Sequence, residues 1–166
     1  VVRESIKHIG YDSSDMGFDW ETCAVISSID KQSPDIAQGV DRADPENQGA
    51  GDQGMMFGFA CKETPTLMPA PLYWSHRLSE RLTEVRKNKT LSFLRPDGKT
   101  AVAFEYNDGK PTAIEAIVIA AQHDPDVEHK KLSEAIREEV IYKIIPAEYI
   151  DKNTKIFINT TGRFVI

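Results

Sequence analysis

A short glycine-rich segment, Gly49-Ala-Gly-Asp-Gln-Gly54, has residue types suited to holding a ligand close to the backbone. Three glycines in six residues permit backbone conformations and close approaches that a Cβ would prevent, and Asp52 supplies a carboxylate between them. The segment is not a standard phosphate or dinucleotide motif, because it lacks a Gly-Lys-Ser/Thr ending and leads into a predicted strand. From its residues alone, an ordinary loop before a buried strand is an equally good interpretation.

Two further motifs carry a cation that could meet a phosphate. Lys99 ends the stretch Arg95-Pro-Asp-Gly-Lys99, whose composition is typical of a tight turn. Arg163 stands beside Phe164, so a guanidinium for phosphate and a ring for stacking on a base come together. A solvated surface lysine, and a core phenylalanine beside a surface arginine, are the alternative interpretations.

Residues 30–54 form a long segment rich in Gly, Pro, Asp and Gln, with almost no large apolar side chain. Structureless loops longer than about 12–15 residues are uncommon in compact domains and are usually functional lids or disordered. Gln32 and Asp35 could contact a zwitterionic ligand here, although simple solvation of the loop explains them equally well. The length of the segment makes it a candidate lid.

The remaining pattern predicts the elements that would position these groups. Apolar periodicity and breakers indicate three helices, at residues 1–9, 69–88 and 128–145. Five strands are predicted at residues 21–29, 55–61, 100–106, 112–121 and 155–159. Asn107-Asp-Gly109 is a hairpin signal between two of them. We therefore expect an α+β fold with helices packed on one face of a mixed β-sheet.

Composition limits the classes of function. The 166 residues carry a formal net charge of −6, a poor starting point for a protein that binds nucleic acid or an anionic membrane. No apolar run approaches the twenty residues of a membrane-spanning helix. Cys23 and Cys61 form no C-x-x-C pattern, so we expect reduced thiols and a cytoplasmic location. The four histidines show no metal-ligand spacing.

The order of the motifs resembles one family along the whole chain. The matching segments are Lys31-Gln-Ser-Pro-Asp-Ile36, Gly39-Val-Asp41, Gly49-Ala-Gly-Asp-Gln-Gly54, Leu67-Met-Pro-Ala-Pro71, Leu94-Arg-Pro-Asp-Gly-Lys99 and Gly162-Arg-Phe-Val-Ile166. Together they are similar to bacterial-type S-adenosylmethionine synthetase, also called methionine adenosyltransferase. The resemblance implies formation of S-adenosylmethionine from ATP and L-methionine, with loss and hydrolysis of the triphosphate.

The resemblance also implies roles for particular residues. Gln32 and Asp52 correspond to methionine-binding positions, and Asp97, Gly98, Lys99, Arg163 and Phe164 to ATP contacts. Lys99 would be the catalytic cation facing the triphosphate, and Phe164 would stack on adenine. The expected gating loop comprises Gln32, Ser33, Pro34, Asp35, Ile36, Ala37, Gln38, Gly39, Val40, Asp41 and Arg42.

The family also implies two Mg²⁺ ions and a K⁺ ion, whose ligands we expect outside this chain. It implies a homodimer or homotetramer, and no nucleic-acid or membrane partner. The expected organisation is the end of an N-terminal domain (1–30), the gating loop and glycine-rich segment (31–54), a central α+β domain (55–154) and the start of a C-terminal domain (155–166). We expect these residues alone to be inactive.

Two other functions remain open from the residues. A structural module that serves only to dimerise would bind no substrate. A general nucleotide-binding protein would need Lys99 and Arg163 but neither Gln32 nor Asp52.

Overall fold

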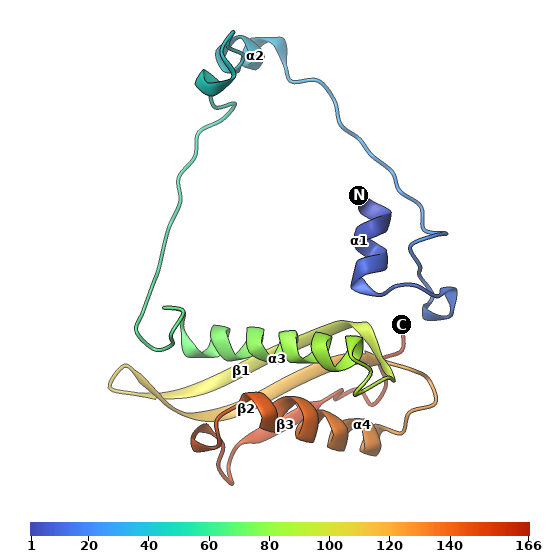
Figure 1. The fold of residues 1–166 in the computed structure, drawn as a ribbon. Coiled ribbons are helices and arrows are strands. Elements are labelled where there is room, and N and C mark those ends of the chain that lie inside the picture. The colour runs from blue at the N-terminus through green and yellow to red at the C-terminus, as the bar shows by residue number, and fades with distance from the viewer. The chain divides into compact units, whose positions relative to one another are not determined.

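The computed structural model describes all 166 residues, Val1 to Ile166, which form two compact units. One unit combines Val1–Cys23 with Ala60–Ile166 and contains the sheet and the long helices (Figure 1). The other is Ala24–Phe59, with helix α2 (Pro34–Val40) and a 3₁₀ turn at Pro45–Asn47. None of the helices has the length and apolar character needed to cross a membrane.

A three-stranded mixed sheet, in the order β1-β2-β3, forms the centre of the larger unit. The long strands β1 (Leu94–Asn107) and β2 (Lys110–His123) pair antiparallel, and β3 (Lys155–Ile158) runs parallel to β2. The predicted hairpin is confirmed: its two turn residues, Asp108 and Gly109, have φ angles of 48° and 73°. Such a turn matches the twist of the strands that it joins.

The helices cover one face of this sheet. Helix α3 (Ala70–Lys87) lies along β1, and α4 (His129–Ile136) continues through a π-helical turn (Arg137–Ile141) into α5 (Tyr142–Ile144). Their apolar side chains close one core with the inward residues of the strands. The fully buried members are Leu78, Val85, Ile114, Ile117, Ile119, Leu132, Ile136, Val140 and Ile141. The predicted α+β class is therefore confirmed.

The opposite face of the sheet stays open. Strand residues alternate between the two faces, so the neighbours of the core residues point the other way. Ala101, Ala103, Val118 and Phe157 are exposed there, and Val118 pairs with both Ala101 and Phe157. The same alternation places the exposed Lys99 and Lys155 on this face, so it carries both small or apolar side chains and two cations.

Helix α1 (Val2–Ile9) and a 3₁₀ turn at Ser14–Met16 belong to the same unit. Gly10 ends α1, with a left-handed φ of 116°. A third 3₁₀ turn, Ala147–Tyr149, follows α5. Tyr149 packs its ring on Phe104 of β1, with centroids 5.2 Å apart.

Two predicted strands are absent, because neither segment has a neighbouring strand to pair with. Residues 21–29 and 55–61 form no strand, and their apolar side chains are exposed: Ile26 is 92% and Phe57 90% accessible. A strand needs a neighbour for its hydrogen bonds, and no strand of this chain pairs with either segment. The predicted loop 30–54 is not structureless either, since Pro34 and Asp35 start α2.

The predicted turn at Arg95–Lys99 is wrong as well, because these residues lie within β1. The strand pairing is irregular between Leu94 and Gly98, so the turn-like composition produces a bulge instead of a reversal.

The domain boundaries proposed from the sequence stay a prediction. Strand β3 pairs with β2 in the same sheet.

A carboxylate outside α3 caps the start of this helix. Glu63 accepts hydrogen bonds from the backbone N–H of Ala70 (2.8 Å) and from the hydroxyl of Tyr106 (2.7 Å). The first residue of α3 and the end of β1 are thus tied to one side chain. The Ala70 N–H bond, followed by the Tyr106 bond, lowers the pKa of Glu63 below its ordinary value of 4.5.

We predict that Glu63→Gln reduces the loss of stability in acid. A carboxyl group with a lowered folded-state pKa stabilises the fold above its unfolded-state pKa, and this contribution disappears as the pH falls through the folded-state value. The free energy of unfolding of the parent chain, measured by urea between pH 7 and pH 3, should therefore fall more steeply than that of Glu63→Gln. Glu105→Gln, an exposed carboxylate on β1, is the control and should keep the parent slope. Equal slopes for Glu63→Gln and the parent would contradict the cap.

Candidate functional site

Three of the predicted ATP contacts meet at one end of the sheet. The ammonium nitrogen of Lys99 lies 3.5 Å from a carboxylate oxygen of Asp97 and 5.0 Å from the centroid of the Phe164 ring. The Lys99 side chain is 70% exposed and that of Asp97 42%, so the pair is an open surface contact of small energy. A cation, a carboxylate and an aromatic face are thus presented together to solvent.

Phe164 reaches this place because the chain turns back after β3. Asn159, which is 3% exposed and left-handed with φ 43°, follows the strand. Its side-chain amide accepts from the N–H of Ala121 (2.8 Å) and donates to the carbonyl of Ala121 (2.9 Å), as a neighbouring peptide would. Gly162, with φ 87°, closes the turn by donating to the Asn159 carbonyl at 2.7 Å.

The returning chain then docks on the last residue of β2. The backbone N–H of His123 donates to the carbonyl of Phe164 at 2.9 Å, and the N–H of Phe164 donates to Nε2 of His123 at 3.1 Å. Nδ1 of the same ring lies 2.8 Å from the carbonyl of Asp124. His123 is 3% exposed, so both ring nitrogens make their bonds in a buried place.

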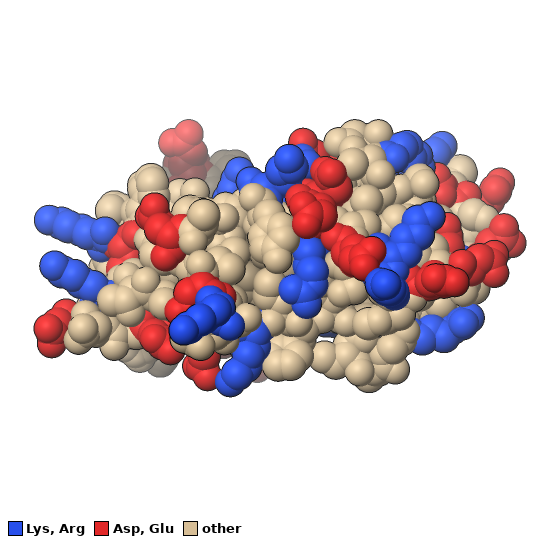
Figure 2. Space-filling model, turned by 90° about the horizontal axis from the view of Figure 1, so that it is seen from below, with Lys and Arg blue, Asp and Glu red and all other residues tan.

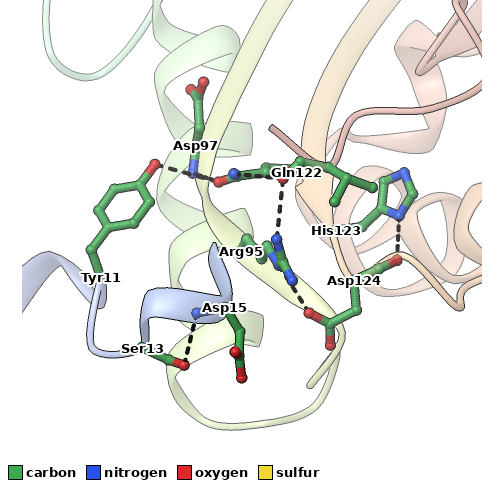
Figure 3. A network of polar contacts seen from close by, with 9 residues as sticks. Tyr11, Ser13, Asp15, Arg95, Asp97, Gln122, His123 and Asp124 are labelled. Atoms are coloured by element: carbon green, nitrogen blue, oxygen red, sulfur yellow. Dashed lines mark hydrogen bonds and ion pairs between the residues drawn. The ribbon is translucent and has the colours of Figure 1, made fainter. Parts of the chain in front are cut away.

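Gln122 connects the two parts of the cluster, as Figure 3 shows. Its side-chain oxygen accepts from the backbone N–H of Asp97 (3.2 Å) and from the hydroxyl of Tyr11 (3.3 Å). Its side-chain nitrogen donates to the carbonyl of Val165 at 3.0 Å. The Asp97 carboxylate points away from this network. Burial, and after it the charge of Asp97, raises the pKa of Tyr11, which favours the neutral hydroxyl as a donor.

A buried arginine, paired with Asp124, also holds the chain that follows Phe164. The Arg95 Nε lies 3.0 Å from Asp124, and its Nη1 donates to the carbonyl of Val165 at 3.2 Å. The Arg95 side chain is only 7% exposed. Val165 therefore receives hydrogen bonds from both Gln122 and Arg95, which fixes the chain directly after Phe164.

The other predicted ATP contacts have fewer restraints. Gly98 is exposed and lies beside Ala121 in the strand ladder. Arg163 is exposed as well, and only its backbone carbonyl accepts a hydrogen bond, from Thr161 at 3.4 Å. A cavity of 80 Å³ lies behind Asp97 and Gly98, against α3. Ligand pockets usually measure about 300–1,000 Å³, so this cavity is too small to enclose a nucleotide.

The predicted methionine contacts lie in the smaller unit. Gln32 precedes α2 and Asp52 follows the first glycines of Gly49–Gly54; both are exposed, and an Asp52 oxygen accepts from the N–H of Gln53 at 2.7 Å. Gly49 donates to the carbonyl of Val40 at 2.8 Å. A Cβ on Gly49 would lie 2.4 Å from the carbonyl oxygen of Gly39, so glycine is required for this contact.

Within this unit the predicted gating loop is thus joined to the glycine-rich segment. Gln48 reinforces the junction: its side chain accepts from the N–H of Arg42 at 3.2 Å and donates to the Arg42 carbonyl at 3.0 Å. The loop and the Gly49 segment form one folded piece. The roles of Gln32 and Asp52 stay predictions.

No three His, Cys, Asp or Glu side chains of this chain gather in a way that could hold a metal ion. On the face seen in Figure 2, acidic and basic side chains are interspersed.

Sequence reasoning did not single out Gln122, His123, Tyr11 or Asn159 as parts of the site. One signal could have found two of them. Gln122 and His123 are polar residues that directly follow the apolar run Ile117–Ala121, at the end of a predicted buried strand. Buried polar groups must find hydrogen-bond partners, so the position of these two residues is a signal of a hydrogen-bond network at this end of the strand.

Comparison with known proteins supplies the family context. Residues 47–164 match the family model described as S-adenosylmethionine synthetase, central domain. The chain is 68% identical to S-adenosylmethionine synthase of Solidesulfovibrio magneticus, 69% to that of Maridesulfovibrio salexigens and 67% to that of Nitratidesulfovibrio vulgaris. Each match covers the whole of this chain but only 43% of the relative's length.

We predict that Gly49→Ala loosens the contact between α2 and the glycine-rich segment. The added Cβ meets a backbone oxygen, so the Gly49–Val40 hydrogen bond must lengthen or break. Hydrogen–deuterium exchange of residues 36–50 should become faster, while the larger unit stays unchanged. Gly54→Ala is the control, because a Cβ there meets no atom within 4 Å. Identical exchange in the two variants would show that the contact is not what orders this segment.

Proposed function

The chain belongs to the S-adenosylmethionine synthetase family, and we propose on that basis that it contributes to a methionine adenosyltransferase. In this reaction the sulfur of methionine attacks C5′ of ATP, the triphosphate leaves, and it is then hydrolysed to phosphate and pyrophosphate. The observation that supports this most directly is the grouping of Lys99, Asp97 and Phe164 at one end of the sheet. These are the positions that the family resemblance assigns to ATP contacts.

Lys99 is the proposed catalytic cation. Negative charge builds on the leaving triphosphate as the C5′–O bond breaks, and a positioned ammonium group stabilises that charge. In the structure Lys99 is exposed and weakly paired, so exchanging Asp97 for phosphate oxygens costs little. Lys99 can therefore leave Asp97 when the nucleotide binds.

Phe164 is the proposed adenine platform. Base stacking on an aromatic side chain contributes about 1–3 kcal/mol. The Lys99 ammonium lies over one face of the ring, 5.0 Å from its centroid, and the residue is half-buried. We propose that the base stacks on the exposed part of this ring. The exposed Arg163 is free to reach phosphate oxygens from the adjacent position.

Methionine binding is assigned to the smaller unit. The side-chain amide of Gln32 and the carboxylate of Asp52 suit the carboxylate and ammonium groups of a zwitterion. Residues 32–42 would close over the bound substrates as a gate. Arg42 is hydrogen-bonded to Gln48, and Val40 to Gly49. These bonds would hold the C-terminal end of the gate in place while the rest of it moves.

The complete enzyme needs more than these residues. We propose that the two Mg²⁺ ions and the K⁺ ion are held by groups outside this chain, as the family resemblance implies. The 166 residues alone should therefore be inactive. A homodimer or homotetramer, and a cytoplasmic location, remain the expectations of the family resemblance.

A structural dimerisation module is the second candidate. The open face of the sheet, with Ala101, Ala103, Val118 and Phe157, is the observation that favours it. Such a module would have no affinity for ATP. Titration of ATP into the chain by calorimetry separates the two, because the absence of any binding heat would favour the module.

We predict that Lys99→Gln lowers kcat of the full-length protein by about 10²–10³-fold, the usual effect of removing one preorganised charge-stabilising group. The reason is loss of the cation that faces the triphosphate. S-adenosylmethionine formation from ATP and methionine is the measurement. Lys110→Gln, an exposed lysine at the hairpin, is the matched control and should keep the parent rate. A Lys99→Gln enzyme with normal kcat would refute the catalytic role.

We also predict that Gln32→Ala and Asp52→Ala weaken methionine binding, each by about tenfold for a lost hydrogen bond to a charged group. Equilibrium binding of labelled methionine to the full-length protein measures this, with ATP affinity as the internal control. A general nucleotide-binding protein would show no methionine binding to lose.

A further inference from the structure

We infer that Gln122 and His123 are positioning residues for the nucleotide contacts, an inference that rests on the proposed function. Neither side chain reaches the open surface: Gln122 is 5% and His123 3% exposed. Each instead binds the backbone beside a proposed ATP contact. Their effect on a nucleotide must therefore pass through Asp97, Lys99 and Phe164.

Gln122 sets the distance between the two contact segments. Its side-chain oxygen accepts from the N–H of Asp97 at 3.2 Å, and its nitrogen donates to the carbonyl of Val165 at 3.0 Å. One planar amide thus joins the start of β1 to the residue after Phe164. Because this amide is planar and buried, it limits the movement of the two segments relative to each other.

The β1 segment needs this support because its own pairing is interrupted. The ladder between β1 and β2 is irregular from Leu94 to Gly98, so the Asp97 N–H bonds to a side chain instead of to a strand. Regular pairing resumes at Gly98 with Ala121 and at Lys99 with Ala120. Gln122 therefore supplies the partner that the strand ladder does not give to Asp97, while the ladder itself holds the backbone of Lys99.

His123 fixes Phe164 through one tautomer. Phe164 donates its N–H to Nε2, so Nε2 carries no proton, and Nδ1–H donates to the carbonyl of Asp124. The His123 backbone N–H also binds the Phe164 carbonyl at 2.9 Å. Phe164 is thus held at both its backbone groups by a single residue, which fixes the backbone from which its ring extends toward Lys99.

Two substitutions of His123 separate the two ring nitrogens. Glutamine places its amide near the position of Nε2 and can still accept from Phe164. Asparagine places its amide near Nδ1 and can still donate to Asp124, but it leaves the Phe164 N–H without an acceptor. The two variants lose one ring bond each and differ in whether Phe164 stays held.

The test measures steady-state kinetics in the full-length enzyme. His123→Asn should raise KM for ATP about tenfold, as expected for one buried hydrogen bond lost, with KM for methionine unchanged. His123→Gln should recover most of the ATP affinity. His129→Asn is the control: this ring also binds the main chain, at the Ile158 carbonyl (3.0 Å), and its loss should leave KM for ATP unchanged.

Other outcomes overturn the inference. Equal KM values for ATP in the asparagine and glutamine variants, or equal increases for ATP and methionine, would show a general structural role. If His123→Asn does not fold, Gln122→Met gives the same readout, because it keeps the side-chain length and removes the bonds to Asp97 and Val165. A normal KM for ATP in that variant would equally overturn the inference.

Failure of the proposed function is recognised separately. If the parent full-length protein forms no S-adenosylmethionine, the enzyme assignment fails, and amide exchange of Phe164 then decides the positioning inference. Exchange should be faster in His123→Asn than in His123→Gln. Equal exchange rates would overturn the hold of His123 on Phe164.

Discussion

The last residues of β2 carry a constraint on which the proposed site depends: polar groups are buried there, and each must have a partner. Ala121 is matched by the side chain of Asn159, Gln122 by Asp97 and Val165, and His123 by Phe164. No buried side-chain nitrogen or oxygen is left without a hydrogen bond. An unpaired buried group costs about 1–3 kcal/mol, so these pairings hold the two contact segments in one arrangement.

The same constraint explains how surface groups become precisely placed. Lys99, Asp97 and Arg163 are exposed or half-exposed and make weak contacts of their own. The backbone at Asp97, Phe164 and Val165, beside these groups, is held by the buried amide, imidazole and guanidinium of Gln122, His123 and Arg95. The exposed groups can then bind a ligand, because the hydrogen bonds that restrain the chain lie in the buried layer beneath them.

Sequence patterns predicted the parts whose structure is decided locally. Helix 69–88, the hairpin at Asn107–Gly109 and the strand at 155–159 follow from periodicity and turn residues, and all three are present. The failures have nonlocal causes. Residues 21–29 and 55–61 have strand composition without a strand to pair with, and Arg95–Lys99 has turn composition inside a bulged strand. The grouping of Lys99 with Phe164 spans 65 positions along the chain, so only the resemblance to a family could suggest it.

The parallel pairing of β2 with β3 has a consequence for the order in which the site forms. The β1–β2 hairpin closes through a two-residue turn, whereas β3 must return across the whole α4–α5 segment before it can pair. Contacts between residues far apart in sequence form slowly, because the entropy of closing the loop is lost first. Lys99 and Asp97 would therefore be in place early, and Phe164 would arrive last. The aromatic ring of the proposed site thus depends on a long-range strand pairing, whereas the cation beside it depends on a short-range hairpin.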